Sequence, residues 1–257
     1  GRYLQPMYAD MNGKTLKGSD YLLAAYSSMM VSDPEFFRID RQANLSMEEL
    51  KAVLADDHGN CPMPSIDLHL SEARSYGQDM LDLGITPLDV MRNTKESKTP
   101  LADFLRFLWN IGGYKDDPLQ KKSALLAYIL VNRPENFLEP AVGEELPPCI
   151  DYHLMRSALR TGMVKVTNDD LRLQIINRSL ISSEDERSIR SAVYETIRRL
   201  VDMPTTNLDM VSVDKFFFQM RQGCPEMTMP ACDLCALDTV CAKDKVLFQP
   251  VIRTTYY

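Results

Sequence analysis

The sequence predicts an all-α protein. In most of the chain, apolar residues recur at the three- and four-residue spacing of a helix with one buried face. Only the stretch MNGKTLKGSDYLLAAY (11–26) begins with an extended pattern, and it soon becomes helical. A chain of 257 residues with 45% apolar side chains can bury a sizeable core. We therefore expect residues 1–257 to form a single unit with two helical lobes and a groove between them.

Six segments carry the helical pattern most clearly. They are 45–56, 65–84, 101–113, 121–131, 182–201 and 211–223. The segment 121–131 (KKSALLAYILV) is apolar nearly all round, which predicts a central buried helix. The segment 182–201 has Ser183 and Glu186 at the spacing of a capping box, which predicts a helix start there. The Pro-rich stretch 133–148 is expected to be an irregular loop, long enough for a functional role.

Composition narrows the kinds of partner. The net charge is −7, whereas a protein that binds duplex nucleic acid usually presents a basic surface. This charge does not favour a nucleic-acid polymer, and it leaves open a local basic face and a small anionic ligand. No run of 18 apolar residues and no signal peptide is visible, so we expect a cytoplasmic protein without a membrane segment. The six cysteines then indicate a metal or catalytic use in a reducing compartment, rather than disulfide bonds.

The strongest chemical signal is a group of four cysteines near the C-terminus. Cys224, Cys232, Cys235 and Cys241 form a C-x7-C-x2-C-x5-C pattern. Four thiolates so close in sequence can wrap one metal centre, and four incidental cysteines are the alternative. Zinc sites usually have two closely spaced pairs of ligands, whereas here one C-x2-C pair is flanked by single cysteines. The open spacing favours a 4Fe–4S cluster held by the loop 224–241, with zinc as the second choice.

A second signal is the segment CIDYHLMRSALRTG (149–162). Asp151 suits the N-cap of a helix, and Gly162 suits the position after its end. From the residues alone, Asp151 is either only a helix cap or a catalytic carboxylate held on one. Lys122, at the start of the preceding helix, is either an end residue with its ammonium in solvent or a base or nucleophile in a cleft. Its neighbour Lys121 could take the same role.

The order of these features resembles the helix-hairpin-helix DNA glycosylases of the endonuclease III type. IDYHLMRSALRTGMV resembles the VDTHxxRxxxRxGxx helix that carries their catalytic Asp, and KSALLAYIL resembles the segment with their upstream lysine. A four-cysteine loop for a 4Fe–4S cluster follows in that family, with a first spacing one residue shorter than here. GGYKDDPLQKKSA stands where the family has its LPGxGxKTA hairpin. Since backbone amides of that hairpin contact DNA phosphates, its absence argues against duplex binding.

A second resemblance extends over almost the whole chain. It is to the queuosine salvage family, the queuosine-5′-phosphate N-glycosylases, which are distant relatives of those DNA glycosylases. Eight segments resemble it in the family's own order: GKTLKGSDYLLAAY, NLSMEELKAVLAD, MPSIDLHLSEARSYG, KKSALLA, IDYHLMRSAL, ERSIRSAVYE, VDKFFF and IRTTYY. That family lacks a cysteine cluster, and its N-terminal F-x-F-W motif is not found in this sequence.

Both resemblances imply a two-lobed DNA-glycosylase-like fold and hydrolysis of an N-glycosidic bond at C1′ of a sugar. Cleavage builds positive charge on the sugar ring, and the Asp151 carboxylate would stabilise that charge and orient or deprotonate water. Lys122 would either form a Schiff base with C1′ or act electrostatically, and the salvage resemblance favours the second role. The candidates for substrate binding are His153, Arg156, Arg190, Arg253 and Tyr257. The arginines suit a 5′-phosphate, whereas the terminal tyrosine either lines the pocket or closes the core.

Three functions remain open at this point. The first is an N-glycosidase that acts on a 7-deazaguanine (queuosine-like) nucleotide or nucleoside, in keeping with the acidic composition and the missing hairpin. The second is an iron–sulfur DNA glycosylase that removes a damaged or modified base, which the cysteine loop and the Asp151 helix favour. The third is a non-catalytic iron–sulfur or nucleic-acid-binding relative that kept the fold.

Overall fold

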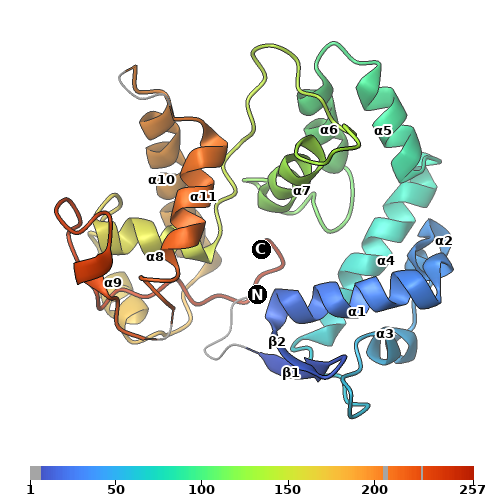
Figure 1. The fold of residues 1–257 in the computed structure, drawn as a ribbon, viewed down its shortest axis with the longest axis horizontal. Helices are drawn as coiled ribbons and strands as arrows, with labels where there is room; N and C mark the ends of the chain where they lie inside the picture. The colour runs from blue at the N-terminus through green and yellow to red at the C-terminus, as the bar shows by residue number, and fades with distance from the viewer. Residues whose placement is uncertain (1–6, 205–207, 227) are drawn as a thin grey trace. The chain divides into compact units, whose positions relative to one another are not determined.

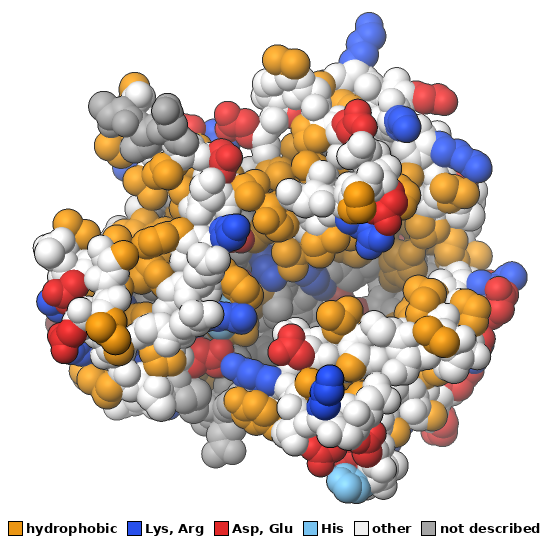
Figure 2. Space-filling model, viewed as in Figure 1, with side chains coloured by type: hydrophobic (Ala, Val, Ile, Leu, Met, Phe, Trp, Pro, Cys, Tyr) orange, Lys and Arg blue, Asp and Glu red, His pale blue; other side chains and the backbone are white. Residues whose placement is uncertain are grey.

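The computed structural model of the chain describes residues 7–204, 208–226 and 228–257. Over these residues the chain forms eleven α-helices, two short 3₁₀ helices and one two-stranded sheet (Figure 1). The all-α prediction is therefore confirmed. None of the described helices is long and apolar enough to cross a bilayer. Charged side chains of both signs lie among exposed hydrophobic ones on the surface (Figure 2).

The described residues divide into two compact units. Residues 7–97 and 106–116 form what we call the N-terminal unit, and residues 98–105 and 117–257 form the C-terminal unit. The helix α6 (Pro100–Leu108) passes from one unit into the other. Each unit has a hydrophobic cluster of its own, so each is described separately.

The N-terminal unit opens with a β-hairpin. Strands β1 (Tyr8–Met11) and β2 (Lys14–Lys17) pair antiparallel, with Met11 opposite Lys14. The two residues between them, Asn12 and Gly13, both have positive φ, as a tight hairpin turn requires. The extended pattern expected near residue 11 is thus real.

Five α-helices follow within this unit: α1 (Gly18–Ser32), α2 (Ile39–Ala43), α3 (Met47–Val53), α4 (Ile66–Leu83) and α5 (Pro87–Lys95), with a 3₁₀ turn at Pro34–Phe37. Helices α2 and α4 pack so closely that a Cβ on Gly77 would overlap the backbone of Ala43. A glycine at this position is therefore a packing requirement.

Helix α6 ends earlier than the predicted segment 101–113. It stops at Leu108, and the chain then turns back onto α4. There the backbone N–H of Gly112 donates to Asp79 at 2.7 Å, and the Lys115 ammonium pairs with the same carboxylate at 2.7 Å. The Gly112 N–H thus bonds to Asp79 instead of to the backbone carbonyl that a longer helix would have offered it.

The C-terminal unit contains the other five helices: α7 (Lys121–Val131), α8 (Tyr152–Thr161), α9 (Asp169–Ile176), α10 (Ser183–Val201) and α11 (Met210–Met220), with a 3₁₀ turn at Cys232–Leu234. Helices α8, α10 and α11 pack against one another. Their shared core contains Leu154, Leu159, Val193, Ile197 and Phe217. Residues 132–151 contain no regular element, as expected for the Pro-rich loop.

Two details of the helix predictions are wrong. Helix α7 is not buried all round, because Leu125 and Ile129 are 36% and 46% exposed while Ala124 and Ala127 are fully buried. The cap of α10 is Ser182, whose hydroxyl accepts from the Asp185 N–H at 3.0 Å. The cap therefore lies one residue earlier than predicted, and the Ser182 hydroxyl also donates to the Asp185 carboxylate at 2.6 Å.

Candidate active site and cysteine pocket

Helix α8 is polar on one side, yet it is buried on all sides. Asp151 caps its N-terminus, and Gly162 ends it with a φ of +80°, both as predicted. Every residue from His153 to Arg160 is buried. A polar helix face inside a protein needs internal partners for its charges. This helix therefore marks the centre of the C-terminal unit's polar chemistry.

The Asp151 carboxylate is held by the start of α8. Its Oδ1 accepts from the backbone N–H groups of His153 at 2.8 Å and Leu154 at 3.2 Å. Its Oδ2 has no hydrogen-bond partner within the described part of the chain. The side chain is 8% exposed. One oxygen is thus fixed by the helix start, and the other is available to a ligand or to water.

Lys121 supplies positive charge to this region. Its charge lowers the pKa values of Asp214 and Cys149, partly opposing other effects that raise them. The charge of Asp151 acts on the same two groups and raises both pKa values. Asp151, Asp214, Lys121 and Cys149 therefore form one electrostatically coupled cluster, which we call the carboxylate cluster.

Asp214 is a site residue that the sequence reasoning missed. It lies on α11, one turn from the buried Met210 and beside the buried Val213 and Phe217. Burial raises its pKa to about 6, and Asp151 adds to the increase. The signal was present in the sequence, because an Asp at this position falls on the apolar stripe of the helix.

The buried thiol of Cys149 belongs to the same surroundings. Burial raises its pKa to about 12, with further contributions from Asp214 and Asp151. It is therefore a neutral thiol at ordinary pH, and it is unsuited to act as a nucleophile.

A buried ion pair links the segment that carries Lys121 to the segment that carries Asp151. Arg190 on α10 donates to both oxygens of Asp117, each at 2.7 Å, and its Nε donates to the Ile150 carbonyl at 2.9 Å. Asp117 also accepts the backbone N–H of Lys121 at 2.7 Å. This network fixes both the start of α7 and the residue before Asp151. It also occupies the Arg190 guanidinium with protein groups, although the sequence offered that side chain as a phosphate ligand.

The terminal tyrosine packs over the same arginine. The Tyr257 ring lies 5.1 Å from the Arg190 guanidinium carbon, and its hydroxyl donates to Glu186 at 3.1 Å. Burial and the adjacent Glu186 raise the Tyr257 pKa. Its ring also lies 6.1 Å from that of Tyr152, next to Asp151. Tyr257 thus closes this side of the cluster.

The remaining predicted ligands separate into buried and exposed residues. His153 and Arg156 are buried, with Arg156 Nη1 3.3 Å from His153 Nδ1 and 3.4 Å from Gln249 Oε1. The Nε and Nη2 atoms of Arg156 have no hydrogen-bond partner among the described residues. Burial and the neighbouring Arg160 lower the Arg156 pKa to about 10. Arg253, in contrast, is exposed.

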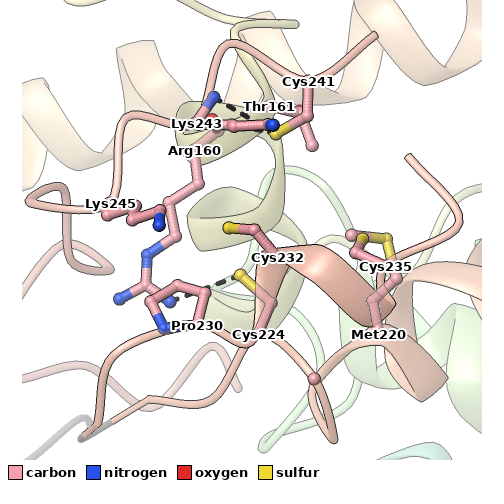
Figure 3. Close-up of a pocket in the computed structure, with 11 residues that line it drawn as sticks. Arg160, Thr161, Met220, Cys224, Pro230, Cys232, Cys235, Cys241, Lys243 and Lys245 are labelled. Atoms are coloured by element: carbon pink, nitrogen blue, oxygen red, sulfur yellow. Dashed lines mark hydrogen bonds between the residues drawn. The ribbon is translucent and has the colours of Figure 1, made fainter. Parts of the chain in front are cut away.

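All four predicted metal ligands line one pocket. Figure 3 shows Cys224, Cys232 and Cys241 around the same space, with Cys235 beside Met220. The thiols are not paired in disulfides. No three Cys, His, Asp or Glu side chains in the described part of the chain are placed to hold a single metal ion.

The polar groups around this pocket suit an anionic sulfur centre. Arg160 Nη1 donates to Cys224 Sγ at 3.4 Å, and the Lys243 N–H donates to Cys241 Sγ at 3.3 Å (Figure 3). The side chains of Lys243 and Lys245 also line the pocket. Four thiolates with N–H donors to their sulfurs are the surroundings that iron–sulfur clusters use. The donor set therefore fits the predicted group.

A larger, mainly apolar pocket shares Thr161 and Cys241 with the cysteine pocket. It has a volume of about 740 Å³ and is lined by residues of α10, α11 and the cysteine loop, including Leu200, Phe216 and Val240. None of the carboxylates or lysines of the carboxylate cluster lines it. The polar chemistry of the unit is therefore outside this pocket.

Comparisons with known proteins do not assign a family. No protein-family model matches the chain, and a search of curated proteins finds no match.

Proposed function

We propose that this protein is an N-glycosidase, a hydrolase that cleaves the N-glycosidic bond of a modified nucleotide or nucleoside. The observation that carries the proposal is the Asp151 carboxylate, held by two backbone amides with one oxygen uncommitted and coupled to Lys121 and Asp214. This is the kind of group that such a reaction needs, because bond cleavage creates positive charge on the sugar ring.

In the proposed reaction, Asp151 stabilises the oxocarbenium-like ring and accepts a proton from the attacking water. The C1′–N bond breaks with its electron pair moving to the base, and the water oxygen takes its place at C1′. Lys121 acts as a fixed positive charge, and we assign it the lysine role that the sequence first gave to Lys122. The support is its shared electrostatic cluster with Asp151.

The substrate class rests on the whole-chain resemblance to queuosine salvage enzymes. We propose a 7-deazaguanine (queuosine-like) base on a ribose or ribose 5′-phosphate. Arg156, with two uncommitted guanidinium nitrogens, and the adjacent His153 are the predicted ligands nearest the start of α8. Arg253 is an exposed alternative for the phosphate. Arg190 is better suited to hold the site together, because its donors already bind Asp117 and Ile150.

The cysteine pocket supports a second function, an iron–sulfur DNA glycosylase. Cys224, Cys232, Cys235 and Cys241 would hold a 4Fe–4S cluster, which their open sequence spacing favours over one zinc ion. When bound, the cluster would supply structural cross-linking of a loop that has little core of its own. We rank this function second because the chain carries a net charge of −7 and lacks the DNA-gripping hairpin. A non-catalytic relative is the third possibility, and it has no feature of its own in support.

Product analysis tests these alternatives directly. The protein is incubated with queuosine-5′-phosphate and, separately, with duplexes bearing modified bases, and free base is measured by mass spectrometry. We expect release from the mononucleotide and none from the duplexes, whereas release from DNA alone would refute the first function. Release from neither, with equal ligand binding by Asp151→Asn and wild type, would favour the third. We also propose a reducing compartment such as the cytoplasm, in keeping with the metal or catalytic use that the six cysteines predict.

The control variants follow from the helix caps. Asp151→Asn keeps a side-chain acceptor for the two amides but removes the charge, so the fold should survive while activity is lost. Asp209→Asn is the matched control, because Asp209 caps α11 by the same kind of bond, to the Ser212 N–H at 2.7 Å, and is exposed. It should keep full activity.

A further inference from the structure

The second carboxylate of the cluster has no structural task that explains it. Asp214 makes no hydrogen bond and no ion pair within the described residues. It nevertheless lies on the inward stripe of α11, between Met210 and Phe217, at a position that an apolar residue would fill more favourably. A carboxyl group kept there without a partner lowers the stability of the protein. Sites of this kind are often functional.

The surroundings of Asp214 raise its pKa and so favour the neutral acid more than solvent would. Helix α11 packs against α8, which carries Asp151, and the charged or titratable groups that act on Asp214 are Asp151 from α8 and Lys121 from α7. Burial and the like charge of Asp151 oppose ionisation, while Lys121 opposes the shift only in part. With a pKa of about 6, Asp214 keeps its proton in a minor but substantial fraction of molecules near neutral pH, and Asp151 Oδ1 is fixed by the backbone N–H groups at the start of α8.

A carboxyl group with a raised pKa, on a helix packed against the one that a second carboxylate caps, is the kind of arrangement that glycoside-cleaving enzymes use as acid and base. A 7-deazaguanine is a poor leaving group as an anion, so its departure needs a proton. We propose that Asp214 is the general acid that protonates the departing base, while Asp151 serves the sugar and the water. This inference rests on the proposed N-glycosidase function and adds a catalytic residue to it.

The proton balance of the step is complete. The Asp214 carboxyl gives its proton to the base as the C1′–N electron pair moves onto the base. Water adds its oxygen to C1′ and gives one proton to Asp151. The products are the neutral base and the free sugar, and solvent then returns a proton to Asp214 and removes one from Asp151. Net consumption is one water, and no oxidant, reductant or further reactant is needed.

The test compares two substrates that differ only in how much their leaving group needs a proton. The first is queuosine-5′-phosphate, and the second is nicotinamide mononucleotide, whose base departs as a neutral molecule without protonation. We expect Asp214→Asn to lower kcat on queuosine-5′-phosphate by about 10²- to 10⁴-fold, with little change in KM. On nicotinamide mononucleotide the loss should be less than about tenfold, whereas Asp151→Asn should lose activity on both.

The pH profile provides an independent readout. Wild-type kcat on queuosine-5′-phosphate should fall as the pH rises above about 6, and this limb should be absent from Asp214→Asn. Equal losses on both substrates, or an unchanged basic limb in the variant, would overturn the general-acid role. If the wild type releases no base from either substrate, the proposed function itself fails. If the wild type cleaves only queuosine-5′-phosphate, the pH profile alone tests the general-acid role of Asp214. The control variant Asp209→Asn should match the wild type in every measurement.

Discussion

The ion pair between Arg190 and Asp117 gives the sharpest prediction about stability. Both side chains are almost fully buried, and their two hydrogen bonds of 2.7 Å are bidentate. Arg190→Met keeps much of the side-chain volume but leaves the Asp117 charge buried with only the backbone N–H groups of Leu119 and Lys121. Removing one partner of a buried pair costs about 3–5 kcal/mol. For a chain of this size each kcal/mol corresponds to about 2–4 °C, so Tm should fall by about 6–20 °C.

An exposed pair in the same unit supplies the control. Arg133 binds Glu135 through two nitrogens at 2.5 and 3.0 Å, but the side chains are 51% and 41% exposed. Arg133→Met should change the free energy of unfolding by less than about 1 kcal/mol. Thermal unfolding of the Asp117→Asn and Arg190→Met single and double variants then gives the coupling energy, which should reach about 2 kcal/mol. A loss below 1 kcal/mol for Arg190→Met, or additive single losses, would refute the reasoning.

Three further predictions follow from other parts of the chain. Because the Asp214 pKa is raised from 3.8 to about 6, its ionisation opposes folding fully above pH 6 and not at all below about 3.8. Asp214→Asn should therefore raise Tm at pH 8 by the equivalent of at most about 3 kcal/mol, with a smaller gain at pH 5, and a pH-independent change would contradict this. Anaerobically purified protein should show broad visible absorbance with bound iron and sulfide, which Cys232→Ala should reduce, whereas a colourless protein with one zinc would exclude the cluster. Gly77→Ala should destabilise the N-terminal unit by at least about 1 kcal/mol, because the added methyl group would overlap the Ala43 backbone. Thermal unfolding measures this loss, and an unchanged Tm would show that α2 and α4 separate easily.

Local patterns predicted the ends of α8 because its caps depend on neighbouring residues alone. Asp151 and Gly162 take the conformations that their residue types favour at a helix start and end. The burial of the polar face of α8 could not be predicted in this way. His153, Arg156 and Arg160 have the composition of a solvated face, and only the packing of α10, α11 and the C-terminal loop encloses them.

The sequence could not decide between Lys121 and Lys122 for a similar reason. Lys121 and Lys122 are adjacent, so the choice between them depends on the direction in which the first turn of α7 faces. Asp117 sets that direction, because its carboxylate accepts the Lys121 N–H while Arg190 from a distant helix holds it in place. Sequence spacing contains no information on that long-range pair, whereas Asp214 could have been found as a charge on an apolar stripe.

Helix α8 connects the two chemical centres of the C-terminal unit through its dipole. Its N-terminus carries partial positive charge and holds the Asp151 anion, whereas its C-terminus carries partial negative charge and meets the cysteine pocket, where the Cys241 thiol lies 3.5 Å from the Arg160 carbonyl. Thiolates there would be repelled by that helix end. Arg160, in the last turn, offsets the repulsion, because its guanidinium reaches Cys224 Sγ and the Leu247 and Pro225 carbonyls. The N-terminal end of α8 thus holds the Asp151 carboxylate where the helix dipole favours negative charge. At the other end, the positive charge of Arg160 compensates for a dipole that would be unfavourable to thiolates.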